Sequence, residues 1–315
     1  MPARLRNTRI WIWVIDMKNR DFGQTLRKRL PLYALLAPFL VLFVIMTVLP
    51  VISSVVLSLF NFDMVSLPRF AGINNYLRMF VQDDLFPTVF KNTLMFAVIT
   101  GPIGFLLSFV LAWMINEFRP AVRTLLSFMF YAPALVGNGL YIWQIIFNSD
   151  SYGYANSILL SLGLITEPVQ WLSNETYIVP IVIVVQLWQS MGISFLANIS
   201  GLQNINQELF EAGSVDGIKN RWQELWYITL PGMQHMLLFS AVMQIASAFS
   251  ISSTITSLAG YPTVGYAADT IVSYLSDVGT VRYEMGYASA LSVVLFMMMI
   301  LTRMLVGKLL RRTGQ

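Results

Sequence analysis

The sequence predicts an all-α membrane protein with six transmembrane helices and both termini in the cytoplasm. The first observation behind this class is composition: of 315 residues, 56% are hydrophobic and 11% are charged, whereas an ordinary soluble domain carries about 25% charged residues. The second is that the apolar residues are gathered in uncharged blocks of about the 20 residues that cross a bilayer. Together they argue against a soluble enzyme.

Six uncharged blocks are expected to be the membrane spans. The first follows a polar segment too long for the n-region of a cleaved signal peptide, so we expect it to remain as an anchor. Residues 1–30 are expected to form a basic cytoplasmic arm, residues 31–306 the six-helix domain, and residues 307–315 a basic tail. The predicted spans lie within Leu32–Phe60, Asn92–Ile115, Thr124–Phe147, Tyr177–Ile199, Met233–Leu258 and Met285–Leu301.

The distribution of charge predicts the orientation of these spans. The chain has 20 Lys and Arg residues. If the N-terminus is cytoplasmic, the outside loops hold only four of them, Arg69, Arg78, Lys91 and Arg282, together with nine of the 16 acidic residues. Cytoplasmic loops of membrane proteins carry the excess of Lys and Arg. The small positive net charge therefore indicates a membrane topology rather than a nucleic-acid partner.

The chain offers few residues for catalysis or metal binding. It has no cysteine and a single histidine, His235, and no phosphate-binding loop of the form G-x-x-x-x-G-K-[ST]. Asp83 and Asp84 are the nearest approach to a carboxylate pair, and we expect them to lie on a solvated loop tip. No catalytic residue and no metal site is predicted, and a membrane-embedded enzyme lacks the acid, base or metal constellation it would need.

The predicted spans contain neutral polar side chains and no Asp, Glu, Lys or Arg. Ion-coupled carriers generally need an ionisable side chain within a span. Amides and hydroxyls can instead hydrogen-bond a neutral, hydroxyl-rich solute, and a tryptophan can stack on a sugar ring. The alternative is that these groups only join helices to one another in lipid. The candidate pathway residues are Gln186, Trp188, Gln189 and Ser190 on the fourth span, and Gln244 and Ser247 on the fifth.

One segment between the fourth and fifth spans carries a specific motif. It reads Glu211-Ala212-Gly213-Ser214-Val215-Asp216-Gly217, and Ile228-Thr229-Leu230-Pro231 follows. Asn206 is suited to cap a helix that begins at Gln207, and Gly217 is suited to end it because glycine adopts the left-handed conformation. We therefore expect a short surface helix of about 10 residues.

This segment, residues 203–231, resembles the EAA loop of permease subunits of bacterial, carbohydrate-type, binding-protein-dependent ABC importers. The resemblance covers nearly the whole chain and is closest to the branch of the larger maltose permease. It implies the type I ABC importer permease fold in a bacterial inner membrane, and a loop helix that docks on an ATPase subunit. The residues it marks for ATPase coupling are Glu211, Ala212, Gly213, Asp216 and Gly217.

The resemblance also implies the partners. These are a second permease, two ATPase subunits that bind ATP and Mg²⁺, an extracytoplasmic solute-binding protein, and a sugar substrate; no cofactor is expected on this chain. Family sugar-contacting positions align with Gln186, Gln189, Ser190 and Ile193. The sequence departs from the family where Gly213 replaces the second alanine. Two alternatives remain open: a permease for another class of small solute, and a facilitator that works without ATP.

Overall fold

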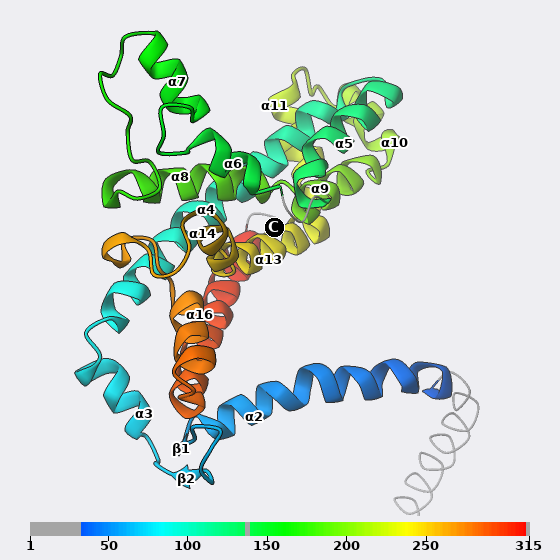
Figure 1. The fold of residues 1–315 in the computed structure, drawn as a ribbon. Coiled ribbons are helices and arrows are strands. Elements are labelled where there is room, and N and C mark those ends of the chain that lie inside the picture. The colour runs from blue at the N-terminus through cyan, green and yellow to red at the C-terminus, as the bar shows by residue number, and fades with distance from the viewer. Residues whose placement is uncertain (1–32, 136–138, 313–315) are drawn as a thin grey trace, which may run out of the picture. The chain divides into compact units, whose positions relative to one another are not determined.

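The structure, a computed structural model, describes residues 33–135 and 139–312. Within these ranges most residues are helical (Figure 1). The elements are η1 (Val44–Val48), α2 (Leu49–Leu57), β1 (Phe60–Asn61), β2 (Arg69–Phe70), α3 (Asn74–Leu77), η2 (Arg78–Gln82), α4 (Phe86–Asn116), α5 (Pro120–Leu135), α6 (Tyr141–Ile146), α7 (Tyr154–Ser161), α8 (Glu175–Gln189), α9 (Ile193–Gln203), α10 (Gln207–Val215), α11 (Arg221–Glu224), η3 (Leu225–Thr229), α12 (Leu230–Gly232), α13 (Gln234–Phe249), α14 (Ser252–Ala259), η4 (Val264–Tyr266), α15 (Ile271–Ser276), η5 (Asp277–Val281) and α16 (Met285–Arg312). The strands β1 and β2 pair antiparallel.

Four described helices are long and apolar enough to cross a membrane. A fifth span is formed if α13 and α14, which meet at a bend of 40°, are counted as one. The third predicted span, Thr124–Phe147, is divided between α5 and α6, and residues 136–138 lie outside the described part. Six spans therefore remain a prediction. The arm, residues 1–30, and the end of the predicted tail also fall outside the described residues. The four helices are Tyr33–Leu57, Phe86–Asn116, Glu175–Gln203 and Met285–Lys308.

The chain divides into two compact units. Within the first, the described residues 33–56 belong to one apolar helix. The second, residues 57–315, is built around α4, α9 and α13, which pack against one another (Figure 1). Phe109 of α4, Phe195 of α9 and Leu237 of α13 belong to one buried cluster of this unit. A further cluster joins α4, α8 and α14 through Phe96, Val182 and Ile255.

The fourth predicted span is interrupted in the middle, at residues 190–192, between α8 and α9. Its first half, α8, begins where the side chain of Asn174 accepts a hydrogen bond from the Thr176 backbone N–H at 2.8 Å, which satisfies one of the free donors at a helix start. The helix stops before Gly192, where a Cβ atom would lie 2.9 Å from the Cβ of Ala134 on α5. The glycine therefore permits α5 to lie close to the break between α8 and α9.

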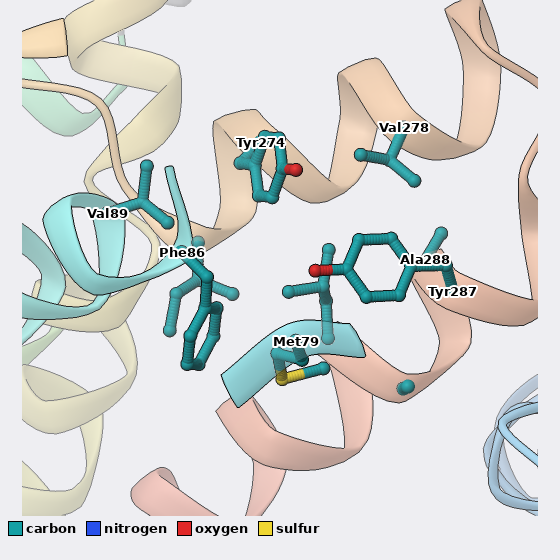
Figure 2. Close-up of a cluster of buried hydrophobic side chains, with 10 residues drawn as sticks. Met79, Phe86, Val89, Tyr274, Val278, Tyr287 and Ala288 are labelled. Carbon is teal, nitrogen blue, oxygen red and sulfur yellow. The ribbon is translucent and has the colours of Figure 1, made fainter. Parts of the chain in front are cut away.

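The expectation for Asp83 is wrong. Its carboxylate is half-buried and accepts hydrogen bonds from the hydroxyl of Tyr274, at 2.6 Å, and from that of Tyr287. It also accepts from the backbone N–H of Leu85 and Phe86, at the start of α4. Of the two adjacent aspartates, only Asp84 is exposed. Figure 2 shows Tyr274 and Tyr287 in the cluster of buried side chains that joins η2, α4, α15 and α16.

Loops that were predicted to share one side of the membrane contact one another. Arg78 pairs with Glu284 at 2.6 Å, and both come from segments predicted to lie outside. Arg221 pairs with Glu117 at 2.5 Å, and both come from segments predicted to lie inside. These two contacts agree with spans that alternate in direction.

We distinguish two ends of the bundle. The loop end consists of the C-terminal end of α4, the start of α5, α10 and α11. The far end consists of residues 78–93, 148–171 and 260–287.

Candidate functional site

The motif segment forms the helix that the sequence predicts. Helix α10 runs from Gln207 to Val215, and the side chain of Asn206 accepts a hydrogen bond from the Glu208 backbone N–H at 3.1 Å. Beyond its end, Gly217 has a φ of +95°, a conformation that costs glycine little. Both the start and the stop of this helix are therefore confirmed.

The five motif residues divide by exposure. Glu211, Ala212, Asp216 and Gly217 are exposed, whereas Gly213 is buried. A Cβ atom on Gly213 would lie 2.7 Å from Cδ1 of Ile228 and 3.0 Å from Cδ1 of Ile218. The departure from the family alanine thus has a structural reason, because this glycine lets α10 lie close to these two isoleucines. Four of the five residues are free to meet a partner.

A polar cavity of about 580 Å³ lies beside α10 at the loop end. Glu211 and Phe210 line one side, and Arg221 lies among the other lining residues. The guanidinium of Arg221 bridges Glu117 at 2.5 Å and Glu224 at 2.8 Å. The hydrogen bond to Glu224, followed by the negative charge of Glu117, raises the pKa of Arg221 above its ordinary value despite partial burial. The bridge ties the segment after α10 to the end of α4.

A second cavity, of about 310 Å³, lies where the break between α8 and α9 faces α13. It contains four of the six predicted pathway residues. None of the described residues that line it is charged. We call it the inner cavity; its lining residues are Ala134, Gln189, Ser190, Gly192, Ile193, Ser194, Met243, Gln244, Ala246, Ser247 and Ser250.

Gln186 does not line the inner cavity but supports it. Its buried amide nitrogen donates to the backbone oxygen of Ser247 at 3.2 Å and to the Ser247 hydroxyl at 3.1 Å. The hydroxyl of Thr254 lies 2.8 Å from Oε1 of Gln186 and 2.9 Å from Oε1 of Gln189. These contacts fix α8 against α13 and α14. Thr254 was not predicted; it lies on α14, beyond the bend that follows α13, so helical spacing from Ser247 does not place it here.

Gln244 is the least satisfied polar side chain of the inner cavity. It is 2% exposed, and its Oε1 has no hydrogen-bond partner among the described residues. A buried acceptor without a partner costs about 1–3 kcal/mol, so this oxygen is suited to a ligand donor. Gly104 of α4 makes room for the side chain, because a Cβ atom there would overlap Nε2 of Gln244. The only sequence signal for Gly104 is a glycine within an apolar block.

Trp188 lies apart from the other candidate pathway residues. It is half-buried and does not line the inner cavity. Its ring packs edge-on against that of Trp143 on α6, with the ring centres 5.4 Å apart. In this conformation Trp188 stabilises the contact between α6 and α8 rather than offering a free face to a sugar.

Comparison with known proteins assigns the fold and the family. Residues 102–315 match the family described as "Binding-protein-dependent transport system inner membrane component". The chain belongs to this family. This permease is also 30% identical, over 282 residues, to the probable ABC transporter permease protein YesP of Bacillus subtilis, a match that covers 88% of this chain and 89% of the relative. It is therefore a non-catalytic membrane subunit of an ABC importer.

Other relatives carry names that state a sugar. The permease is 30% identical to the arabinooligosaccharides transport system permease protein AraP of Halalkalibacterium halodurans, with 84% of this chain and 83% of the relative covered. It is 28% identical to the lactose transport system permease protein LacF of Rhizobium radiobacter, over 65% of this chain and 68% of the relative. The crystal structure of a bacterial ABC transporter that imports the acidic polysaccharide alginate contains a chain of the same fold, with a TM-score of 0.76, 24% identity, and coverage of 94% and 100%.

Proposed function

We propose that this permease forms, with a second permease, the membrane pathway for a neutral oligosaccharide or a similar polyhydroxylated solute. The observation that carries the proposal is the inner cavity, which offers amide and hydroxyl groups, an unpartnered acceptor on Gln244, and no charged lining residue among those described. Such groups bind hydroxyls without the cost of desolvating a charge. Relatives named for arabinooligosaccharides and lactose support a sugar as the substrate.

The loop end is the proposed site of energy coupling. Helix α10 exposes Glu211, Ala212, Asp216 and Gly217, and we expect this face to dock on one of two ATPase subunits, which hold ATP and Mg²⁺. Closure of the ATPases would carry α10 with them and switch the pathway between inward- and outward-facing states as a rigid-body motion. The substrate would arrive from an extracytoplasmic binding protein; a transporter of the same fold has been crystallised with a periplasmic protein that carries a pentasaccharide.

The proposed topology has six spans with both termini in the cytoplasm, so that the loop end faces the ATPases. The third span would consist of α5, residues 136–138 and α6. The chain has no cysteine, so single cysteines can be placed in the natural sequence. We expect Ser214→Cys at the loop end to react only after the membrane is permeabilised, and Ser161→Cys at the end of α7 to react in intact cells. The opposite pattern would reverse the orientation.

The direct test is to purify the chain with the products of its neighbouring genes and measure ATP hydrolysis and uptake in lipid nanodiscs and proteoliposomes. We expect a second permease and two ATPases to copurify, with hydrolysis stimulated by binding protein loaded with neutral oligosaccharide. If only another class of solute stimulated hydrolysis, the chain would still be an ABC importer subunit, but the proposal that its substrate is a sugar would fail. Solute flow through the purified chain without ATP would support a facilitator.

A further inference from the structure

A third cavity, of about 610 Å³, lies between α14 on one side and α15 with η5 on the other. We call it the outer cavity. It adjoins the inner cavity, since Ser250 lines both. Along this part of the chain the inner cavity is lined by residues from Met243 to Ser250, and the outer cavity by residues from Ser250 to Ser257. These residues lie on and between α13 and α14, which are joined by a bend (Figure 1). The lining residues are Ser250, Ser252, Ser253, Thr256, Ser257, Tyr261, Val272, Ser273, Ser276, Asp277, Thr280 and Val281.

Hydroxyl groups line both sides of the outer cavity, and along each side they recur every three or four residues. Ser250, Ser253 and Ser257 follow one side, and Ser273, Ser276 and Thr280 follow the other; separations of three and four residues place side chains on one helix face. Several of these hydroxyls use their proton within their own helix: Ser276 donates to the backbone oxygen of Val272 at 3.0 Å, and Thr280 to that of Ser276 at 2.6 Å. Their lone pairs remain available, so the walls are rich in acceptors.

Ser252 offers an unbonded hydroxyl to the outer cavity. The residue is 7% exposed and lines this cavity, and its hydroxyl makes no hydrogen bond within the described part of the chain. A ligand that reaches into the outer cavity can therefore hydrogen-bond Ser252 without displacing a protein partner.

The outer cavity offers hydrogen-bond acceptors, and no cationic side chain lies among its described lining residues. Asp277 is the one charged residue among the described residues that line it. Its Oδ2 is held by Arg282 at 2.7 Å; no hydrogen bond to its Oδ1 is present in the described part of the chain, so that oxygen can still accept one. Burial, followed by the nearby charge of Asp277, raises the pKa of Tyr261, so the Tyr261 hydroxyl stays protonated. A carboxylate and a set of acceptors favour a ligand that donates hydrogen bonds, which is what neutral sugar hydroxyls do.

We propose that the outer cavity is a second sugar subsite, which binds the distal units of a neutral oligosaccharide whose proximal units lie in the inner cavity. This inference rests on the proposed function and extends it to substrate length.

The test uses the assembled importer in proteoliposomes, with its binding protein in excess and neutral arabino-oligosaccharides of two to five units as probes. The outer variant is Ser253→Ala with Ser257→Ala and Ser276→Ala. The control is Ser161→Ala, whose exposed hydroxyl makes the same local bond, to the backbone oxygen of Ile158 at 2.8 Å, but lies away from both cavities. A third variant, Ser190→Ala, changes the inner cavity.

We expect the outer variant to raise KM for the longest probe about tenfold, since each lost hydrogen bond contributes about 0.5–1.5 kcal/mol, and to leave the disaccharide unchanged. Ser190→Ala should weaken uptake of oligosaccharides of every length, and the control Ser161→Ala should weaken uptake of none. Equal effects of the outer variant on all lengths, or no effect on any, would overturn the outer subsite while leaving the proposed function in place. If the natural importer takes up no neutral oligosaccharide of any length, the sugar function and the subsite both fail.

Discussion

The loop end and the far end of the bundle are held together in different ways. At the loop end, Arg221 is 62% exposed at its side chain and Glu117 is 41% exposed, and their ion pair joins α11 to α4. The far end also has an exposed ion pair, Arg78–Glu284, but there buried side chains bind backbone groups as well: Asn92 donates to the backbone oxygens of Tyr266, at 2.9 Å, and Asp269, at 3.0 Å. Exposed ion pairs contribute about 0–1 kcal/mol, whereas a buried polar group that loses its partner costs about 1–3 kcal/mol.

This difference matches the roles proposed for the two ends. A loop that follows the movement of an ATPase needs contacts that can break and form again at little cost. The far end supports the outer cavity, and a subsite keeps its shape only if its walls are fixed. We therefore expect substitutions at the far end to lower stability, and substitutions at the loop end to change coupling with little loss of stability.

The largest loss of stability is expected from Asn156→Leu at the far end. Asn156 is fully buried, and its side chain bonds the backbone of Asn148, Asp150 and Val169 and the indole N–H of Trp171. Leucine leaves these groups without partners, so we expect a destabilisation of about 3 kcal/mol or more, seen as a lower midpoint in thermal unfolding of the purified importer. If the midpoint of Asn156→Leu equalled that of the control Ser161→Ala, the claim that buried polar contacts stabilise the far end would be wrong.

Gly104→Ala is expected to reduce uptake at least tenfold while the importer still assembles. The added methyl group would overlap Nε2 of Gln244 and would displace this side chain into the inner cavity. Gly101→Ala, three residues earlier on α4, is the matched control because its Cβ atom would meet the Cβ of Ala248 at an ordinary 3.9 Å. If the two variants transport equally, Gln244 does not shape the pathway.

Asp83→Asn is expected to cost about 1–2 kcal/mol. Burial alone would raise the pKa of Asp83, but hydrogen bonds from Tyr274 and Tyr287 outweigh it and hold the pKa below 3.8 in the folded chain. Because folding lowers this pKa, the stabilisation is present above the unfolded value and is lost as pH falls through the folded value. Thermal midpoints measured from pH 6 to pH 3 should fall more steeply for the natural protein than for Asp83→Asn. Parallel curves would show that the Asp83 carboxylate does not stabilise the far end.

The smallest loss of stability, at most about 1 kcal/mol, is expected from Arg221→Ala. Its effect should appear instead in the sugar taken up per ATP hydrolysed, because the bridge to Glu117 is one route from α10 to α4. The triple change Glu117→Arg, Arg221→Glu and Glu224→Arg reverses every charge of the bridge and should restore the ratio. A ratio that stays low in this reversed variant would assign the loss to Arg221 alone.

The sequence predicted the parts that depend on near neighbours. The start of α10 at Asn206 and its end at Gly217 follow from capping, which acts within a few residues. Gln189, Ser190, Gln244 and Ser247 were predicted as neutral polar side chains within apolar spans, and they line one cavity. Contacts between distant segments could not be predicted in this way.

Asp83 is the clearest case, since the tyrosines that bind it lie 191 and 204 residues further along the chain. Trp188 is another, because the ring of Trp143 on a different helix decides which way it packs. Neither contact leaves a local pattern in the sequence.

In the proposed importer, α10 couples ATP hydrolysis on a partner to sugar movement through the inner cavity. The most direct measurement is the ratio of oligosaccharide taken up to ATP hydrolysed, in proteoliposomes, for the natural importer and for Glu211→Ala, an exposed change on α10. We expect the variant complex to assemble normally and its uptake per ATP to fall at least tenfold. A Glu211→Ala importer that assembles and keeps the natural ratio would contradict this role of α10.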